Sequence, residues 1–130
     1  MDVDFAFLCD SAQESGGKVH ALGIGIDGIF APSVPATHSV VLVAQFRYWA
    51  SEAGTRAMAV RLIDADGHSL SAAEGQIAFG DPGDSPTGVA RVLLTLAALP
   101  FERYGDYAIH IAIADGEPVR LPLRVMAPRP

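Results

Sequence analysis

Residues 107–125 read Tyr-Ala-Ile-His-Ile-Ala-Ile-Ala-Asp-Gly-Glu-Pro-Val-Arg-Leu-Pro-Leu-Arg-Val, and this stretch decides the fold class. Apolar side chains occupy alternate positions in 107–113 and again in 119–125, which is the period of a half-buried strand. Between the two runs, Asp115-Gly116 is a strong signal for a tight turn. The stretch therefore predicts a β-hairpin with one face in a core. Pro122 lacks a backbone N–H, so we expect it at a sheet edge.

The same alternation recurs in earlier runs, which are separated by clusters of Gly, Pro, Asp and Ser. These runs cover residues 3–9, 18–30, 38–49, 58–62, 69–79 and 92–96. No segment carries the apolar stripe of a helix. We therefore expect a single all-β domain over residues 1–130. Its architecture would be an eight-strand, mainly antiparallel Greek-key sandwich, immunoglobulin-like or C2-like, with no substantial helix. Gly105-x-Tyr107 resembles a tyrosine corner, in which a phenol bonds back to the backbone.

The composition excludes several classes of protein. Of the 130 residues, 50% are hydrophobic and 18% are charged, so disorder is not the dominant state. The net charge of −6 and the scattered Lys and Arg side chains argue against a nucleic-acid partner. No apolar run reaches the roughly 18 residues of a membrane span, so we expect no transmembrane segment. The single cysteine and the acidic N-terminus, unlike a signal peptide, favour a cytoplasmic location.

The longest run, residues 38–49, is apolar on both faces over its first half. Val40, Leu42 and Ala44 share one face, while Val41 and Val43 lie on the other, which indicates a central strand or an interface. The run 18–30 similarly has small residues opposite its large apolar ones, and Trp49 ends the long run on the second face. The candidate interface residues are therefore Ala21, Gly23, Gly25, Val41, Val43 and Trp49.

Asp64-x-Asp66-Gly67 begins like a calcium-binding loop, but the further oxygen ligands and the distal Glu of an EF-hand are absent. A plain hairpin turn is the favoured interpretation. If loops converged at one end of the sandwich, Asp81 and Asp84 could join Asp64 and Asp66 as weak ligand candidates. We expect no metal and no cofactor.

No catalytic constellation is present in the sequence. Cys9 shares parity with Phe5 and Phe7, which predicts a buried, inert thiol instead of a nucleophile. A Gly-x-Ser-x-Gly motif is absent, and so is a phosphate-binding glycine loop. The histidines lie on separate segments without the spacing of a zinc site, at His20, His38, His68 and His110. We therefore expect that the chain is not an enzyme.

Several short stretches resemble one known family. They include Phe7-Leu8-Cys9-Asp10, Gly28-Ile29-Phe30-Ala31-Pro32, Leu42-Val43-Ala44-Gln45-Phe46-Arg47 and Leu99-Pro100-Phe101. In these stretches the chain is similar to a family of small bacterial all-β proteins catalogued only as a domain of unknown function. The resemblance covers nearly the whole chain and implies an eight-strand sandwich, but it supplies no activity.

Two hypotheses about function follow, from different classes. The first is a non-enzymatic protein-binding or assembly module, which self-associates or joins a protein partner, because the apolar content exceeds what one inner face per strand needs. The alternative is a ligand-binding sandwich that contacts carbohydrate, or a membrane with the help of calcium, through its loops. An enzyme with a dispersed active site ranks below both.

Overall fold

The computed structural model describes residues 1–114 and 116–129. The described chain forms ten strands and one short 3-10 helix, η1 (Ala50–Glu52), and no helix in it is long and apolar enough to span a membrane. In chain order the strands are β1 (Asp2–Cys9), β2 (Ser11–Ser15), β3 (Lys18–Leu22), β4 (Gly28–Phe30), β5 (Ala36–Trp49), β6 (Gly54–Asp64), β7 (Ser69–Phe79), β8 (Thr87–Phe101), β9 (Gly105–Ile113) and β10 (Val119–Met126).

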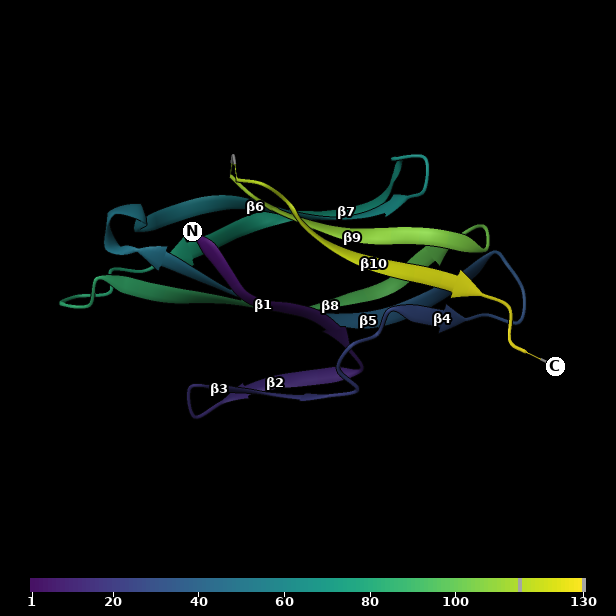
Figure 1. Ribbon diagram of the computed structural model, residues 1–130, viewed down its shortest axis with the longest axis horizontal. Coiled ribbons are helices and arrows are strands. Elements are labelled where there is room, and N and C mark those ends of the chain that lie inside the picture. Colours follow the sequence, from purple (N-terminus) through teal and green to yellow (C-terminus); the bar gives the residue numbers. More distant parts are fainter. Residues whose placement is uncertain (115, 130) are drawn as a thin grey trace.

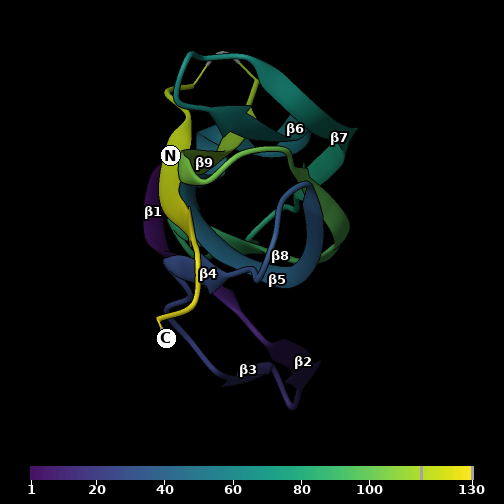
Figure 2. The same ribbon diagram turned by 90° about the vertical axis from the view of Figure 1, so that its right-hand side faces the viewer.

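The strands form two facing sheets and a separate hairpin. One sheet has the order β1-β5-β8 and the other the order β4-β10-β9-β6-β7, and every pairing is antiparallel apart from β4 with β10. The hairpin β2–β3 lies outside the three-stranded sheet, on the side away from the five-stranded one (Figures 1 and 2). The predicted all-β sandwich is confirmed, and the hairpin adds a third layer to it.

The predicted count of eight strands is wrong, because two segments differ from expectation. Residues 11–15 lie between the predicted runs 3–9 and 18–30, but they form β2 and pair with β3 across the Gly16-Gly17 turn. The expected strand 18–30 is divided into β3 and β4 by residues 23–27, which belong to no strand. Gly23 and Gly25 cause this division, since their φ angles of 68° and 93° are incompatible with a ladder.

The core lies between the two sheets. Val40, Leu42, Ala44, Phe46 and Tyr48 of β5 all face it and are buried, as their alternation predicts. The five-stranded sheet supplies the opposing residues, which include Val60, Leu62, Ile109, Ile111, Leu123 and Val125. The same strand buries Val43 on its second face, so β5 is covered on both sides. This confirms that it is a central strand.

The hairpin expected from residues 107–125 corresponds to β9 and β10, which pair from Val119 opposite Ile111 to Val125 opposite Gly105. Of its predicted turn, Asp115 lies outside the described residues. Pro122 pairs with Ala108 of β9, and β4 covers only residues 124–126 of the other edge of β10. Pro122 therefore lies beside an uncovered part of that edge, where its missing N–H removes no ladder bond.

The predicted tyrosine corner is also confirmed. The Tyr107 hydroxyl donates to the Arg103 carbonyl oxygen at 2.7 Å and accepts from the Arg103 N–H at 3.3 Å. The ring meets Phe101 edge to face, with centroids 5.0 Å apart. The Tyr107 side chain thus contacts both the end of β8, at Phe101, and the connection to β9, at Arg103. It therefore holds this connection in place.

We expect Tyr107→Phe to lower the free energy of unfolding by about 1–2 kcal/mol, because the partly buried N–H and carbonyl groups of Arg103 lose their partner. Chemical denaturation measures this change. Tyr104→Phe is the matched comparison, since that hydroxyl also donates to a backbone carbonyl, of Ala31, but from an exposed side chain. Equal losses from the two variants would contradict the corner's structural role.

Candidate functional site

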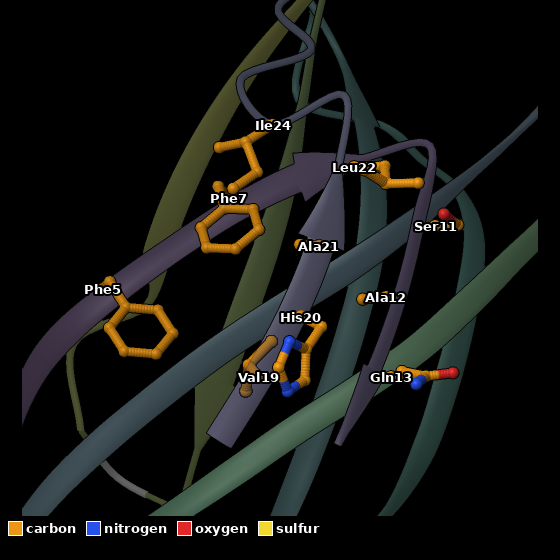
Figure 3. Close-up of a pocket in the computed structure, with 10 residues that line it drawn as sticks. All are labelled: Phe5, Phe7, Ser11, Ala12, Gln13, Val19, His20, Ala21, Leu22 and Ile24. Atoms are coloured by element: carbon orange, nitrogen blue, oxygen red, sulfur yellow. The ribbon is translucent and has the colours of Figure 1, made fainter. Parts of the chain in front are cut away.

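A groove of about 780 Å³ separates strand β1 from the hairpin β2–β3. In Figure 3 the rings of Phe5 and Phe7 extend from β1 toward β3. The residues that line this hairpin groove are Phe5, Phe7, Ser11, Ala12, Gln13, Val19, His20, Ala21, Leu22 and Ile24. Its volume lies within the range of roughly 300–1,000 Å³ that is typical of ligand sites.

Backbone hydrogen bonds attach the base of the hairpin to β1. The Asp10 N–H donates to the Leu22 carbonyl at 3.0 Å, and the Gly25 N–H donates to the Leu8 carbonyl at 2.9 Å. Gly23 makes the close turn between them possible: a Cβ at this position would lie 2.1 Å from the Asp10 carboxylate. The glycines at 23 and 25 therefore direct the chain out of the hairpin and back to the sandwich.

A chain of polar contacts attaches the hairpin tip to the outer face of the three-stranded sheet. Arg91 of β8 donates from Nη1 to the Gly17 carbonyl at 2.8 Å and pairs with Glu14 at 3.5 Å. Its Nε donates to Gln45 Oε1 at 2.6 Å, and Gln45 Nε2 donates to Asp4 Oδ2 at 2.8 Å. Gln45 is only 8% exposed. The network thus links all three strands of the sheet to the hairpin turn.

The network ends at an ion pair between Arg47 of β5 and Asp4 of β1. Arg47 donates from Nη2 to Asp4 Oδ2 at 2.9 Å and from Nε to Oδ1 at 3.3 Å. The hydrogen bond from the Gln45 amide, followed by the one from Arg47, lowers the pKa of Asp4 below its ordinary value. Asp4 therefore stays ionised at neutral pH and keeps accepting all three hydrogen bonds.

The surface of the hairpin groove is apolar and accessible. Leu22 is 72% exposed and Ile24 is 59% exposed, which is unusual for such large aliphatic side chains in one short segment. The rings of Phe5 and Phe7 stack with centroids 5.9 Å apart and remain half-buried. Only His20, Ser11 and Gln13 contribute polar side chains. The lining of the hairpin groove is therefore mainly apolar.

The structure places the six predicted interface residues in different environments. Ala21 lines the groove, and Gly23 and Gly25 are exposed where the chain leaves the hairpin. Val41 is half-buried, and Val43 is fully buried on the face of β5 that the hairpin covers. Trp49 is exposed at the far end of β5, outside the groove. Three of the six therefore belong to the hairpin and its exit.

Phe5 and Phe7 line the groove from the outer face of β1. The sequence suggested a single inner face for this strand and did not show which of its two faces that is. Their shared parity with Cys9 is correct, because they lie opposite Gln45, Val43 and Val41 in turn. That face, however, is the outer one, and the intervening Leu8 enters the core. A bulge between residues 3 and 5 shifts the register, so Val3 does not share the face of Phe5, Phe7 and Cys9. The Gly16-Gly17 pair between two five-residue segments was the signal that could have revealed the hairpin.

The Asp64–Asp66 turn closes the β6–β7 hairpin, as predicted. Ligand atoms of Asp64, Asp66 and His68 lie within 4.8 Å of one another. Asp64 Oδ1, however, already accepts the N–H groups of Asp66 and His68, at 3.0 and 2.8 Å, and these bonds lower the pKa of Asp64, His68 contributing most. Asp66 pairs with Arg103 at 3.6 Å. These contacts explain the cluster as a stabilised turn.

Asp81 and Asp84 do not join this cluster. They follow β7, whereas Asp64 and Asp66 precede it, so the two pairs lie at opposite ends of an eleven-residue strand. Figure 1 shows the two connections at opposite ends of the molecule. Asp81 Oδ1 accepts the Gly83 N–H at 2.8 Å, which is again a local turn contact. The two acidic pairs therefore do not meet the condition of converging loops under which all four aspartates could share one ligand site.

Cys9 is fully buried at the end of β1, as predicted. Burial raises the pKa of its thiol, and the neighbouring carboxylate of Asp10 adds to the effect. The thiolate needed for nucleophilic chemistry is thus disfavoured at neutral pH.

These features define a class of protein: a two-sheet β-sandwich that carries an apolar groove beneath an added hairpin. The chain belongs to DUF6941, a family of unknown function, whose profile matches residues 4–126. The resemblance noted in the sequence to a domain of unknown function is thereby confirmed. No curated protein and no solved structure matches the chain.

Proposed function

We propose that this chain is a non-enzymatic protein-binding module that uses the hairpin groove to hold apolar side chains of another polypeptide, either a second copy or a different protein. The observation that carries this proposal is the exposure of Leu22 and Ile24 beside the stacked Phe5 and Phe7 rings. Contiguous apolar surface of this kind is typical of interaction sites.

The attachment of the hairpin supports the same role. Backbone bonds hold its base, and Arg91 holds its tip, so the groove exists before any partner binds. A preformed groove loses less conformational entropy on binding than a disordered segment would. Two anchors would be unnecessary if the hairpin were only a tolerated surface insertion.

The test removes apolar surface without adding charge. We expect the double variant Leu22→Ser/Ile24→Ser to weaken association by roughly tenfold or more, since each buried aliphatic side chain contributes about 1.5–3 kcal/mol. Sedimentation velocity over a concentration series measures self-association. A photo-crosslinking residue at position 22, used in extract of the source organism, captures any other protein.

The matched control is Phe30→Ser/Val89→Ser, which removes two exposed apolar side chains outside the groove. Its association should stay within about twofold of the original, because no groove contact is lost. A protein that remains monomeric at high concentration, and that crosslinks to nothing from position 22, would refute the proposal.

A further inference from the structure

A second cavity, of about 680 Å³, opens at the end of the sandwich where the chain begins. It reaches between the sheets to core side chains of three different strands. Its deep wall consists of Phe46 of β5, Phe79 of β7, and Ile111 and Ile113 of β9. The cavity shares no lining residue with the hairpin groove, so it forms an independent candidate site.

Arg56 of β6 is a cation in the wall of this cavity. Its guanidinium carbon lies 5.7 Å from the centroid of the Phe79 ring, and Nη2 donates to the carbonyl oxygen of Glu52. Its Nε is buried and finds no hydrogen-bond partner among the described residues. Buried polar groups in folded proteins are almost always satisfied, so the unsatisfied Nε leaves the hydrogen-bonding capacity of this guanidinium incompletely used within the fold.

The charge of Arg56 is also uncompensated by contact. Within the described part of the chain, no carboxylate oxygen lies within 4.0 Å of Arg56. Five other arginines do pair with a carboxylate, and they are Arg47, Arg61, Arg91, Arg103 and Arg124. Glu52 is the nearest acidic neighbour in sequence. Its oxygens accept the Met1 amine at 3.0 and 3.1 Å and the Trp49 N–H at 3.0 Å, so they are already engaged.

We infer that this cavity binds a small monocarboxylate with an apolar body. The carboxylate would meet the terminal nitrogens of Arg56, because a guanidinium and a carboxylate match in planar, paired geometry. The apolar body would pack against the exposed apolar part of the lining, where Met1 is 37% and Val3 is 43% exposed, and would remove that surface from water. Stacking on Phe79 and the bond to Glu52 fix the guanidinium beforehand, which lowers the entropic cost of binding.

The charged residues at the mouth of the cavity indicate how many negative charges its ligand can carry. Asp2 and Glu117 both line the mouth of the cavity and are exposed. Water and salt screen their charges, so a single carboxylate at the half-buried Arg56 remains favourable. A dicarboxylate or a phosphate would place a second charge near these acids, and the Met1 amine, the other cation in the described lining, is already paired with Glu52. The class of ligand is therefore a monocarboxylate.

Octanoate and octanamide form the matched probe pair, since they share the chain and differ in charge. Their binding to the full chain is followed by ¹H–¹⁵N NMR, with attention to the Arg56 Nε–H and to the amides of Phe79 and Ile111. We expect octanoate to shift these signals and to bind roughly tenfold or more tightly than octanamide, as a charge-assisted bond requires.

Arg56→Gln should weaken octanoate binding by roughly tenfold and leave octanamide binding nearly unchanged. Arg120→Gln is the control, because it removes the same charge from an exposed arginine that lies outside this cavity. The inference is overturned if octanoate at millimolar concentration shifts none of these signals, if octanamide binds equally well, or if Arg120→Gln weakens octanoate binding as much as Arg56→Gln does. The comparison of the two probes on the unchanged protein stands even if Arg56→Gln does not fold.

Discussion

Gln45→Leu is expected to lower the free energy of unfolding by about 1–3 kcal/mol and to loosen the hairpin β2–β3. The leucine has a similar volume but cannot accept from Arg91 Nε or donate to Asp4. Arg91 then keeps only its contacts with Gly17 and Glu14, and its guanidinium is less firmly held against the sheet. The cost is large for one amide because Gln45 is buried and joins two charged groups.

Hydrogen exchange separates the two parts of this effect. Amides of residues 11–22 should exchange faster in Gln45→Leu than the overall loss of stability explains, since the hairpin tip opens locally. Gln76→Leu is the matched control, because Gln76 is exposed on β7 of the other sheet. That variant should change stability by no more than about 0.5 kcal/mol. If exchange in the hairpin followed global unfolding alone, the anchoring role of the network would be refuted.

Gly88→Ala is expected to lower the free energy of unfolding by about 1–3 kcal/mol, through overpacking. A Cβ at position 88 would lie 2.7 Å from both Cζ and the hydroxyl oxygen of Tyr48. The ring cannot retreat, because its other neighbours hold it. It stacks on Phe79 with centroids 4.4 Å apart, and its hydroxyl donates to the Gly80 carbonyl at 2.6 Å.

Chemical denaturation of Gly75→Ala provides the comparison, since a Cβ at Gly75 meets nothing within 4 Å. This variant should be neutral or slightly more stable, because alanine restricts the unfolded chain. A double-mutant cycle then assigns the cause: in a Tyr48→Ala background, Gly88→Ala should cost little. A full penalty in that background would show that the collision with the ring is not the reason.

The alternation of apolar residues predicted most of the sandwich. It identified the long central strand, the β9–β10 hairpin and the faces that β5, β9 and β10 turn to the core. The motif Gly105-x-Tyr107 predicted the tyrosine corner, and the parity of Cys9 with Phe5 and Phe7 predicted that Cys9 is buried. These features depend on neighbours along the chain or on a strict period of two, both of which can be read directly in the sequence.

The candidate site was less predictable. Ala21, Gly23 and Gly25 lie in or beside the hairpin groove, but Phe5 and Phe7, which also line it, were not among the predicted interface residues. β2 was missed because Ser-Ala-Gln-Glu-Ser has little apolar content to show a period. Arg56 had no distinguishing sequence context, since its importance comes from Phe79 and Glu52.

The sequence by itself determined that this protein is an all-β sandwich, and which residues of each strand share a face. Only the tertiary structure decided which face of β1 is the core, that a hairpin covers the outer face of β5, and that Arg56 lines a cavity without a paired acid. The reason is physical. A period of two fixes the relative orientation of side chains within a strand, but the layer that covers each face comes from residues far away in the chain.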